Sequence, residues 1–214
     1  MSAEETIAQI AKEVSVCTKC ALHEGRKKSV PGEGPATAEI MFIGEGPGFH
    51  ENEQGRPFVG AAGKFLDELL AQAGVTRADV FITNVVKCRP PENRDPLPDE
   101  LAACDHYLEA QIKTINPSII VTLGRISMSK FFTGVKISVV HGQLQKVGER
   151  FVIPMFHPAA ALHQAALKPT ILADFAKLPE LLKEARAALG KTNVNKEKKP
   201  VVQQDEEPKQ LNLF

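Results

Sequence analysis

The chain has 214 residues, of which 43% are hydrophobic, and this is enough to bury one good core, so we expect a single domain. Its formal net charge is zero, which argues against a histone-like coat of positive charge. Charged residues interrupt the apolar positions of residues 1–16, so we expect no signal peptide there. No other stretch is long and apolar enough to cross a bilayer, so we expect no membrane span. We therefore predict a soluble, cytoplasmic protein, and we expect it to be a monomer.

Short apolar runs alternate with longer helical patterns along the chain. Strands are predicted at residues 39–44, 80–84, 118–124 and 151–156, and helices at residues 61–74, 99–116 and 171–189. This alternation is typical of a parallel sheet with helices on both faces. It predicts an α/β fold, a three-layer α/β/α sandwich with a central, mostly parallel four-stranded sheet. We place the domain at residues 1–190 and expect the polar residues 191–214 to form a disordered C-terminal tail.

Four cysteines form the strongest chemical signal in the sequence. Cys17 and Cys20 are spaced as C-x2-C, while Cys88 and Cys104 flank a proline-rich loop at residues 89–98. In a reducing compartment, four such thiols are more readily metal ligands than disulfides. Structural zinc sites usually take two close pairs, and the second pair here is spread. The spacing therefore favours an iron–sulfur centre and leaves a structural zinc site open.

A glycine-rich turn follows the first predicted strand, with the sequence Gly-Glu-Gly-Pro-Gly at residues 44–48. Glycines let the backbone approach a ligand closely at the carboxyl end of a strand. A dinucleotide-binding fingerprint is disfavoured, because Pro47 interrupts the loop, no helix is expected directly after Gly48, and the second strand ends in Asn84 rather than an acidic residue.

Four side chains are expected to meet at the carboxyl edge of this sheet. Asn84 ends the second predicted strand and His157 follows the fourth, while Glu45 and Phe58 lie in the loops after the first. Taken singly, each is more often a turn or core residue. Together they offer an amide, an imidazole, a carboxylate and a stacking ring, which are the groups needed to hold a flat, hydrogen-bonding ring and cut a bond beside it.

Five short motifs follow one another along the chain. They are Gly-Glu-Gly-Pro-Gly at 44–48, Gly-Arg-Pro-Phe-Val-Gly at 55–60, Thr-Asn-Val-Val-Lys-Cys-Arg-Pro-Pro-Glu-Asn-Arg at 83–94, Leu-Gly at 123–124 and Met-Phe-His-Pro-Ala at 155–159. In these motifs, and over most of residues 5–185, the chain resembles the family 4 uracil-DNA glycosylases, which carry a four-iron, four-sulfur cluster. The resemblance implies a 4Fe-4S cluster on the four cysteines and base excision repair, in which the N-glycosidic bond of uracil in DNA is hydrolysed to leave an abasic site.

The resemblance also implies how uracil is held. The extruded base would stack on Phe58, and the side-chain amide of Asn84 would read its Watson–Crick edge. His157 would hydrogen-bond uracil O2 and stabilise the negative charge that develops on the leaving base.

The residue that positions the attacking water is less clearly marked. In related uracil glycosylases a carboxylate or amide in the first loop does this, and here Gly46 occupies that place and lacks a suitable side chain. We therefore assign the water, or the ordering of the loop, to Glu45, with Glu51 as a second candidate.

Two departures from the family pattern concern DNA contacts and lyase chemistry. Where relatives often carry a bulky side chain followed by Arg, residues 159–163 read Ala-Ala-Ala-Leu-His, which leaves Leu162 as the candidate wedge into the DNA. The loop at residues 89–98 contains no His, so we expect simple hydrolysis rather than covalent capture of the abasic site.

Two alternatives from other classes remain. One is a non-catalytic nucleic-acid-binding module with a structural metal site, and the other is a redox carrier. Neither class has a reason to gather Glu45, Phe58, Asn84 and His157 at one sheet edge, so that gathering discriminates between them and an enzyme.

The last five residues suggest a protein partner. Gln210, Leu213 and Phe214 resemble a shortened sliding-clamp-binding peptide, in which apolar side chains fill a pocket and Gln caps it. A terminus without a partner is the alternative.

Overall fold

The computed structural model describes residues 1–191, so the predicted tail and the peptide at residues 210–214 lie outside the described part of the chain. The strands are β1 (Ile40–Gly44), β2 (Phe81–Asn84), β3 (Ile119–Leu123), β4 (Gln145–Val147) and β5 (Arg150–Met155). The α-helices are α1 (Ala3–Val16), α2 (Phe49–Gln54), α3 (Ala61–Gln72), α4 (Pro98–Ile115), α5 (Arg125–Ser129), α6 (Ile137–Val140), α7 (Pro158–His163), α8 (Lys168–Ala176) and α9 (Leu178–Ala188). Short 3-10 turns are η1 (Ala21–His23), η2 (Arg77–Asp79), η3 (Pro91–Asn93) and η4 (Ala165–Leu167).

The strands form one sheet in the order β2-β1-β3-β5-β4. The pairs β1–β2, β1–β3 and β3–β5 are parallel, and β4 pairs antiparallel with β5. The predicted α/β class and mostly parallel sheet are confirmed, but the count of four strands was wrong because β4 was missed. That strand has only three residues, Gln-Lys-Val, and lies half-exposed at the sheet edge, so it shows no apolar run.

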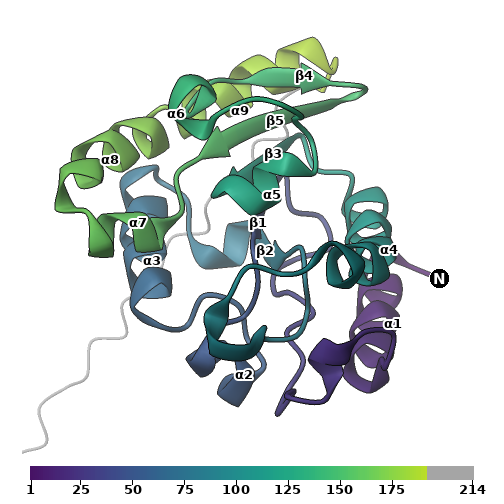
Figure 1. The fold of residues 1–214 in the computed structure, drawn as a ribbon. Coiled ribbons are helices and arrows are strands. Elements are labelled where there is room, and N and C mark those ends of the chain that lie inside the picture. Colours follow the sequence, from purple (N-terminus) through teal and green to yellow (C-terminus); the bar gives the residue numbers. More distant parts are fainter. Residues whose placement is uncertain (192–214) are drawn as a thin grey trace, which may run out of the picture.

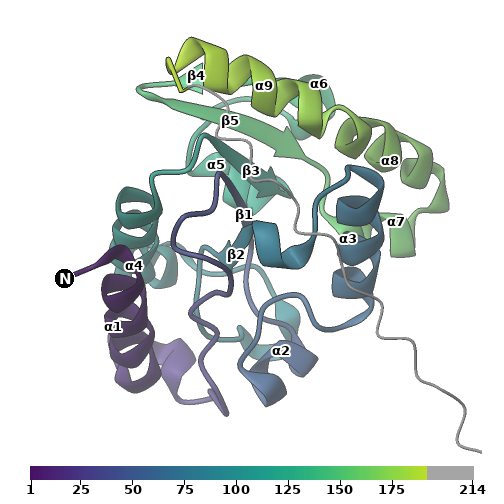
Figure 2. The same ribbon diagram turned by 180° about the vertical axis from the view of Figure 1, so that it is seen from behind.

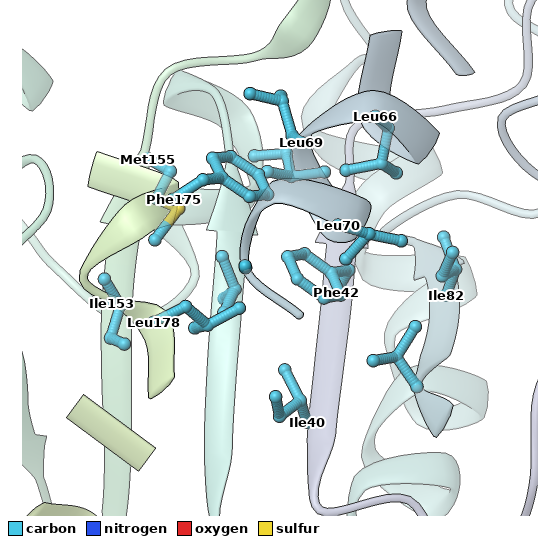
Figure 3. Close-up of a cluster of buried hydrophobic side chains, with 14 of the residues drawn as sticks. Ile40, Phe42, Leu66, Leu69, Leu70, Ile82, Ile153, Met155, Phe175 and Leu178 are labelled. Carbon is cyan, nitrogen blue, oxygen red and sulfur yellow. The ribbon is translucent and has the colours of Figure 1, made fainter. Parts of the chain in front are cut away.

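Helices cover both faces of the sheet, as predicted. Helices α3, α8 and α9 lie on one side, and α1, α4 and α5 lie on the other (Figures 1 and 2). On the first side, Phe42 of β1 stacks on Phe175 of α8 with ring centroids 5.9 Å apart, inside the cluster of buried side chains in Figure 3. This apolar layer fixes β1 at the centre of the molecule and leaves the loops at its carboxyl end to form a site.

Several helices differ from the expectation. The helix predicted over residues 171–189 is two helices, α8 and α9, because Pro179 has no N–H to continue the hydrogen-bond ladder across the junction. The expectation that no helix opens after Gly48 was also wrong, since α2 begins at Phe49. Among residues 1–191, no helix is long and apolar enough to span a bilayer.

Candidate active site

The carboxyl ends of β1, β2 and β5 open onto one pocket. Parallel pairing sets Gly44 beside Asn84, and His157 follows β5. The pocket encloses about 910 Å³, including the space at its mouth, and its lining is Glu45, Gly46, Gly48, Glu51, Phe58, Ala62, Asn84, Asn93, His157, Ala159 and His163. All six predicted site residues, Glu45, Gly46, Glu51, Phe58, Asn84 and His157, are among them.

Gly44 forms the floor of the pocket, where the side-chain amide of Asn84 and the ring of Phe58 come together. A Cβ atom at this position would lie 2.4 Å from Asn84 Oδ1 and 2.8 Å from Phe58 Cζ, so only glycine fits. Asn84 as a whole residue is 2% exposed, and its side-chain amide makes no hydrogen bond with the rest of residues 1–191. Because Asn84 lines the pocket, the donors and the acceptor of this amide are open to a ligand there.

Phe58 is held in a strained backbone conformation. Its φ of 52° lies in the left-handed region that favours glycine. Arg77 donates hydrogen bonds to the carbonyl oxygens of Pro57 and Phe58, the latter at 3.1 Å, which fixes this turn. The Phe58 ring stacks beside the His157 ring at 5.5 Å and 26°, so the two rings line the pocket together.

The hydrogen bonding of His157 defines its tautomer. The backbone N–H of Ala159 donates to His157 Nδ1 at 3.1 Å, so the neutral ring carries its proton on Nε2. Burial lowers the pKa of His157 to about 4, against an opposing effect of the Glu51 carboxylate. At neutral pH this residue is therefore an uncharged imidazole that can donate one hydrogen bond from Nε2.

The two candidate carboxylates are used differently. Glu51 accepts hydrogen bonds from the backbone N–H groups of Gly48, Val59 and Gly60 at 2.9–3.1 Å, and so ties the first loop to the segment that carries Phe58. The Glu45 carboxylate makes no hydrogen bond within residues 1–191, although the backbone carbonyl oxygen of Glu45 accepts from the Val86 N–H at 3.2 Å. Burial, followed by the charge of Asp95, raises the pKa of the Glu45 carboxyl above the usual value. Of the two, Glu45 is the carboxylate available to a ligand or water.

Sequence reasoning missed two polar residues of the pocket, Asn93 and His163. Asn93 has a left-handed backbone (φ 56°), and its side-chain oxygen accepts from Arg89 Nε at 2.8 Å. His163 ends α7. Neither position follows a strand, so the rule that places ligands at strand ends gave no signal for them.

A second cavity is lined by all four cysteines. Its lining is Val14, Cys17, Lys19, Cys20, Leu22, His23, Val86, Lys87, Cys88, Ala103, Cys104 and Tyr107. All four thiols are free, with Cys88 and Cys104 buried and the other two half-buried. Within residues 1–191 no three His, Cys, Asp or Glu side chains are arranged to hold a single metal ion. The thiols surround a space rather than converge on one point.

The protein around three of the thiols opposes their ionisation. Burial raises the pKa of Cys20, Cys88 and Cys104, the last to about 11. Arg26 acts in the other direction, because its Nη1 donates to Cys88 Sγ at 3.6 Å and also to the Cys17 carbonyl oxygen. A metal centre bound here would supply the positive charge that thiolate ligands need.

Lys87 lies between the pocket and the cysteine cavity and is fully buried. Its Nζ donates to Thr83 Oγ1 at 2.6 Å, to the Asn84 carbonyl oxygen at 2.9 Å and to Gln111 Oε1 at 2.7 Å. Burial lowers its pKa to about 8, and the Cys104 thiol opposes that shift. The same amine therefore holds the backbone of Asn84 and stands beside the cysteines, a role that the sequence did not reveal.

Comparison with known proteins identifies relatives over most of the chain. Residues 31–188 match the family model described as "Uracil DNA glycosylase superfamily". A "Type-4 uracil-DNA glycosylase" of Thermotoga maritima is 46% identical over 186 residues, covering 85% of this chain and 97% of that protein. One from Saccharolobus solfataricus is 49% identical over 185 residues, covering 81% and 85%. A "Type-5 uracil-DNA glycosylase" of Thermus thermophilus is 37% identical over 116 residues, covering 47% and 52%.

Proposed function

The chain belongs to the type-4 uracil-DNA glycosylases of the uracil DNA glycosylase superfamily, and we propose that it removes uracil from DNA by hydrolysing the N-glycosidic bond. The product is an abasic site, which makes this a base-excision-repair reaction. The observation that carries the proposal is the amide of Asn84, which has no hydrogen-bond partner within residues 1–191 and lies beside the ring of Phe58 on the floor of an open pocket.

Base recognition follows from those two groups. The base, extruded from the DNA, stacks on Phe58, and the Asn84 amide accepts from uracil N3–H and donates to O4. Cytosine presents the reverse pattern of donor and acceptor at these positions. It would leave polar groups unpaired in a buried site, at a cost of about 1–3 kcal/mol for each group.

His157 stabilises the departing base. As the bond from the sugar carbon to N1 breaks, electrons move onto the uracil ring and the sugar becomes oxocarbenium-like. The Nε2–H of the neutral imidazole donates to uracil O2, where negative charge builds up. Because the backbone N–H of Ala159 fixes Nδ1, the donor is oriented before the reaction begins.

Water completes the hydrolysis. Glu45, whose carboxylate has no partner within residues 1–191, orients a water molecule toward the sugar carbon and takes one of its protons. Glu51 supports this step indirectly by holding the loop. Leu162 is 53% exposed on α7 and precedes His163, which lines the pocket. This exposure supports the proposal that Leu162 fills the gap that the extruded base leaves.

The cysteines are proposed to hold a 4Fe-4S cluster. Four thiols that line one space suit a group that is held between its ligands, and Cys17, Cys20, Cys88 and Cys104 supply the four sulfur atoms. The cluster would be structural: it would tie the end of α1 to the start of α4 and to the segment after β2.

The activity is tested by incubating the purified holoprotein with an oligonucleotide that contains one uracil, then cleaving abasic sites with alkali. We expect cleavage at uracil and none at thymine or cytosine. Asn84→Asp should weaken excision of uracil and allow some excision of cytosine. Absence of cleavage by the iron-loaded wild-type protein would contradict the proposal and favour a binding module.

A clamp partner is proposed separately. Gln210, Leu213 and Phe214 fall outside the described residues, so the proposal rests on the sequence. Removing residues 210–214 should abolish binding to a sliding clamp and spare excision. Unchanged clamp binding would refute it.

A further inference from the structure

Phe49 is a large aromatic side chain that the protein leaves exposed at the edge of the pocket. It is 54% exposed, although burying such a ring would normally be favourable. It follows Gly48 directly, and Gly48 lines the pocket, so the two Cα atoms are about 3.8 Å apart. Phe49 therefore lies immediately beside the wall of the pocket.

The ring is also presented in a defined way. The guanidinium carbon of Arg89 lies 5.4 Å from the centre of the Phe49 ring, in a cation–π contact. Arg89 is fixed in turn, because its Nε donates to Asn93 Oδ1 at 2.8 Å and Asn93 lines the pocket. His50 approaches the same ring edge-on at 5.4 Å. Because two neighbouring side chains contact the exposed ring, the ring has little conformational freedom. It therefore loses little conformational entropy when a ligand stacks on it.

From this arrangement we propose that Phe49 and Arg89 form a stacking site for the nucleobase next to the extruded uracil on the same strand. The inference rests on the proposed function. When a base leaves the stack, its neighbour loses one stacking surface, and an exposed aromatic ring can replace it. The guanidinium of Arg89 adds a positive charge next to the phosphate that joins the two nucleotides.

This site differs from the wedge proposed at Leu162. Leu162 and Phe49 belong to α7 and α2, which are separate elements in both views (Figures 1 and 2). The aliphatic side chain fills the gap inside a duplex, whereas the aromatic ring engages a base and needs no complementary strand. The stacking site therefore predicts that Phe49 matters for single-stranded substrates as well.

The test uses single-turnover excision on single-stranded oligonucleotides with one central uracil, with enzyme concentration varied to separate half-saturation from the maximal rate. The proteins are wild type, Phe49→Ala, Phe49→Trp and, as a matched control, Val139→Ala, which truncates an apolar side chain 66% exposed on α6. Three oligonucleotides are compared: one with normal neighbours, and two in which the neighbour on the 5′ or the 3′ side is replaced by a tetrahydrofuran residue, which lacks a base and is not cleaved by alkali.

With normal neighbours, Phe49→Ala should raise the half-saturating concentration on the order of tenfold and keep the maximal rate within about twofold. Phe49→Trp and Val139→Ala should behave as wild type. Removing the base on one side should raise the half-saturating concentration of the wild-type protein by the same factor. The same removal should not raise the half-saturating concentration of Phe49→Ala any further.

An equal loss for Phe49→Ala on all three oligonucleotides, or no loss at all, would overturn the inference. If wild type excises no uracil, the proposed function fails, and the stacking site is then judged by fluorescence anisotropy with the same oligonucleotides at fixed salt. A loss of DNA binding that requires both Phe49 and the neighbouring base would support the stacking site in that assay. If no such loss is measured, the stacking site is refuted.

Discussion

The base-binding pocket and the cysteine cavity lie on the two sides of one short segment, residues 84–88, and they are built in opposite ways. Asn84 starts this segment and faces an open, polar pocket, whereas Cys88 ends it and faces a smaller cavity lined largely by apolar side chains. In the pocket, the Asn84 amide and the Glu45 carboxylate have no hydrogen-bond partner within residues 1–191. Around the cysteines, burial raises the pKa of Cys20, Cys88 and Cys104.

The difference separates recognition from stability. A site that binds and releases a ligand must keep unsatisfied hydrogen-bonding groups, and these cost folding free energy. A closed metal site can instead contribute folding free energy, because its ligands meet only in the folded chain. Changes in the cavity should therefore act on stability, and changes in the pocket should act on rate.

Cys104→Ala should give the largest effect, and it should fall on stability. Losing one thiolate ligand should cost about 4 kcal/mol or more, equivalent to a Tm lower by roughly 10 °C for a chain of this size. Differential scanning calorimetry, with iron and sulfide analysis of the anaerobically purified protein, measures this. Zinc without iron in the wild-type protein would contradict the cluster, and a fully stable, iron-free Cys104→Ala protein would contradict its structural role.

His157→Ala should slow excision by roughly a hundredfold or more, because the donor to the developing charge on O2 is lost. DNA binding at fixed salt and the Tm should change little, since phosphate contacts supply most of the affinity. Single-turnover kinetics gives the rate, and His106→Ala, which truncates an exposed histidine on α4, serves as the control. A wild-type rate for His157→Ala would show that the pocket is misassigned.

Lys87→Met should affect both regions, because Lys87 bridges them. It removes the donor to Thr83, Gln111 and the Asn84 carbonyl oxygen, and each buried acceptor left unpaired costs about 1–3 kcal/mol. We expect a lower Tm together with weaker discrimination of uracil from cytosine. A change confined to the Tm would mean that Asn84 keeps its position without this amine.

The smallest effect concerns pH. Because the pKa of Glu45 is raised, the carboxylate becomes protonated as the pH falls through a value above that of an ordinary Glu. The rate should then fall about tenfold per pH unit on the acid side. His157 does not account for this fall at mildly acidic pH, since its pKa is about 4. Glu45→Gln should excise uracil more slowly at neutral pH, and its rate should not show this fall on the acid side of the pH profile. If the fall is unchanged in this variant, Glu45 is not the group that causes it.

Much of the fold and of the pocket could be predicted from the sequence. The four long strands carry continuous apolar runs because both of their faces are buried, so their order along the chain predicted a mostly parallel sheet. Parallel strands end at one edge, which is why Asn84 and His157 could be expected to meet. The resemblance of the motifs to a known family supplied the roles that spacing alone left open.

Other features depended on the tertiary structure. The edge strand β4 and helix α2 are too short to show a period, so only their contacts reveal them. The sequence ranked Glu45 ahead of Glu51 but left both roles open, and the two carboxylates differ because three backbone N–H groups converge on Glu51. Lys87 looks like an ordinary charged residue until the fold encloses it. Partners that lie far apart along the chain decide such roles, because burial and hydrogen bonding are set by what packs around a side chain rather than by its neighbours in sequence.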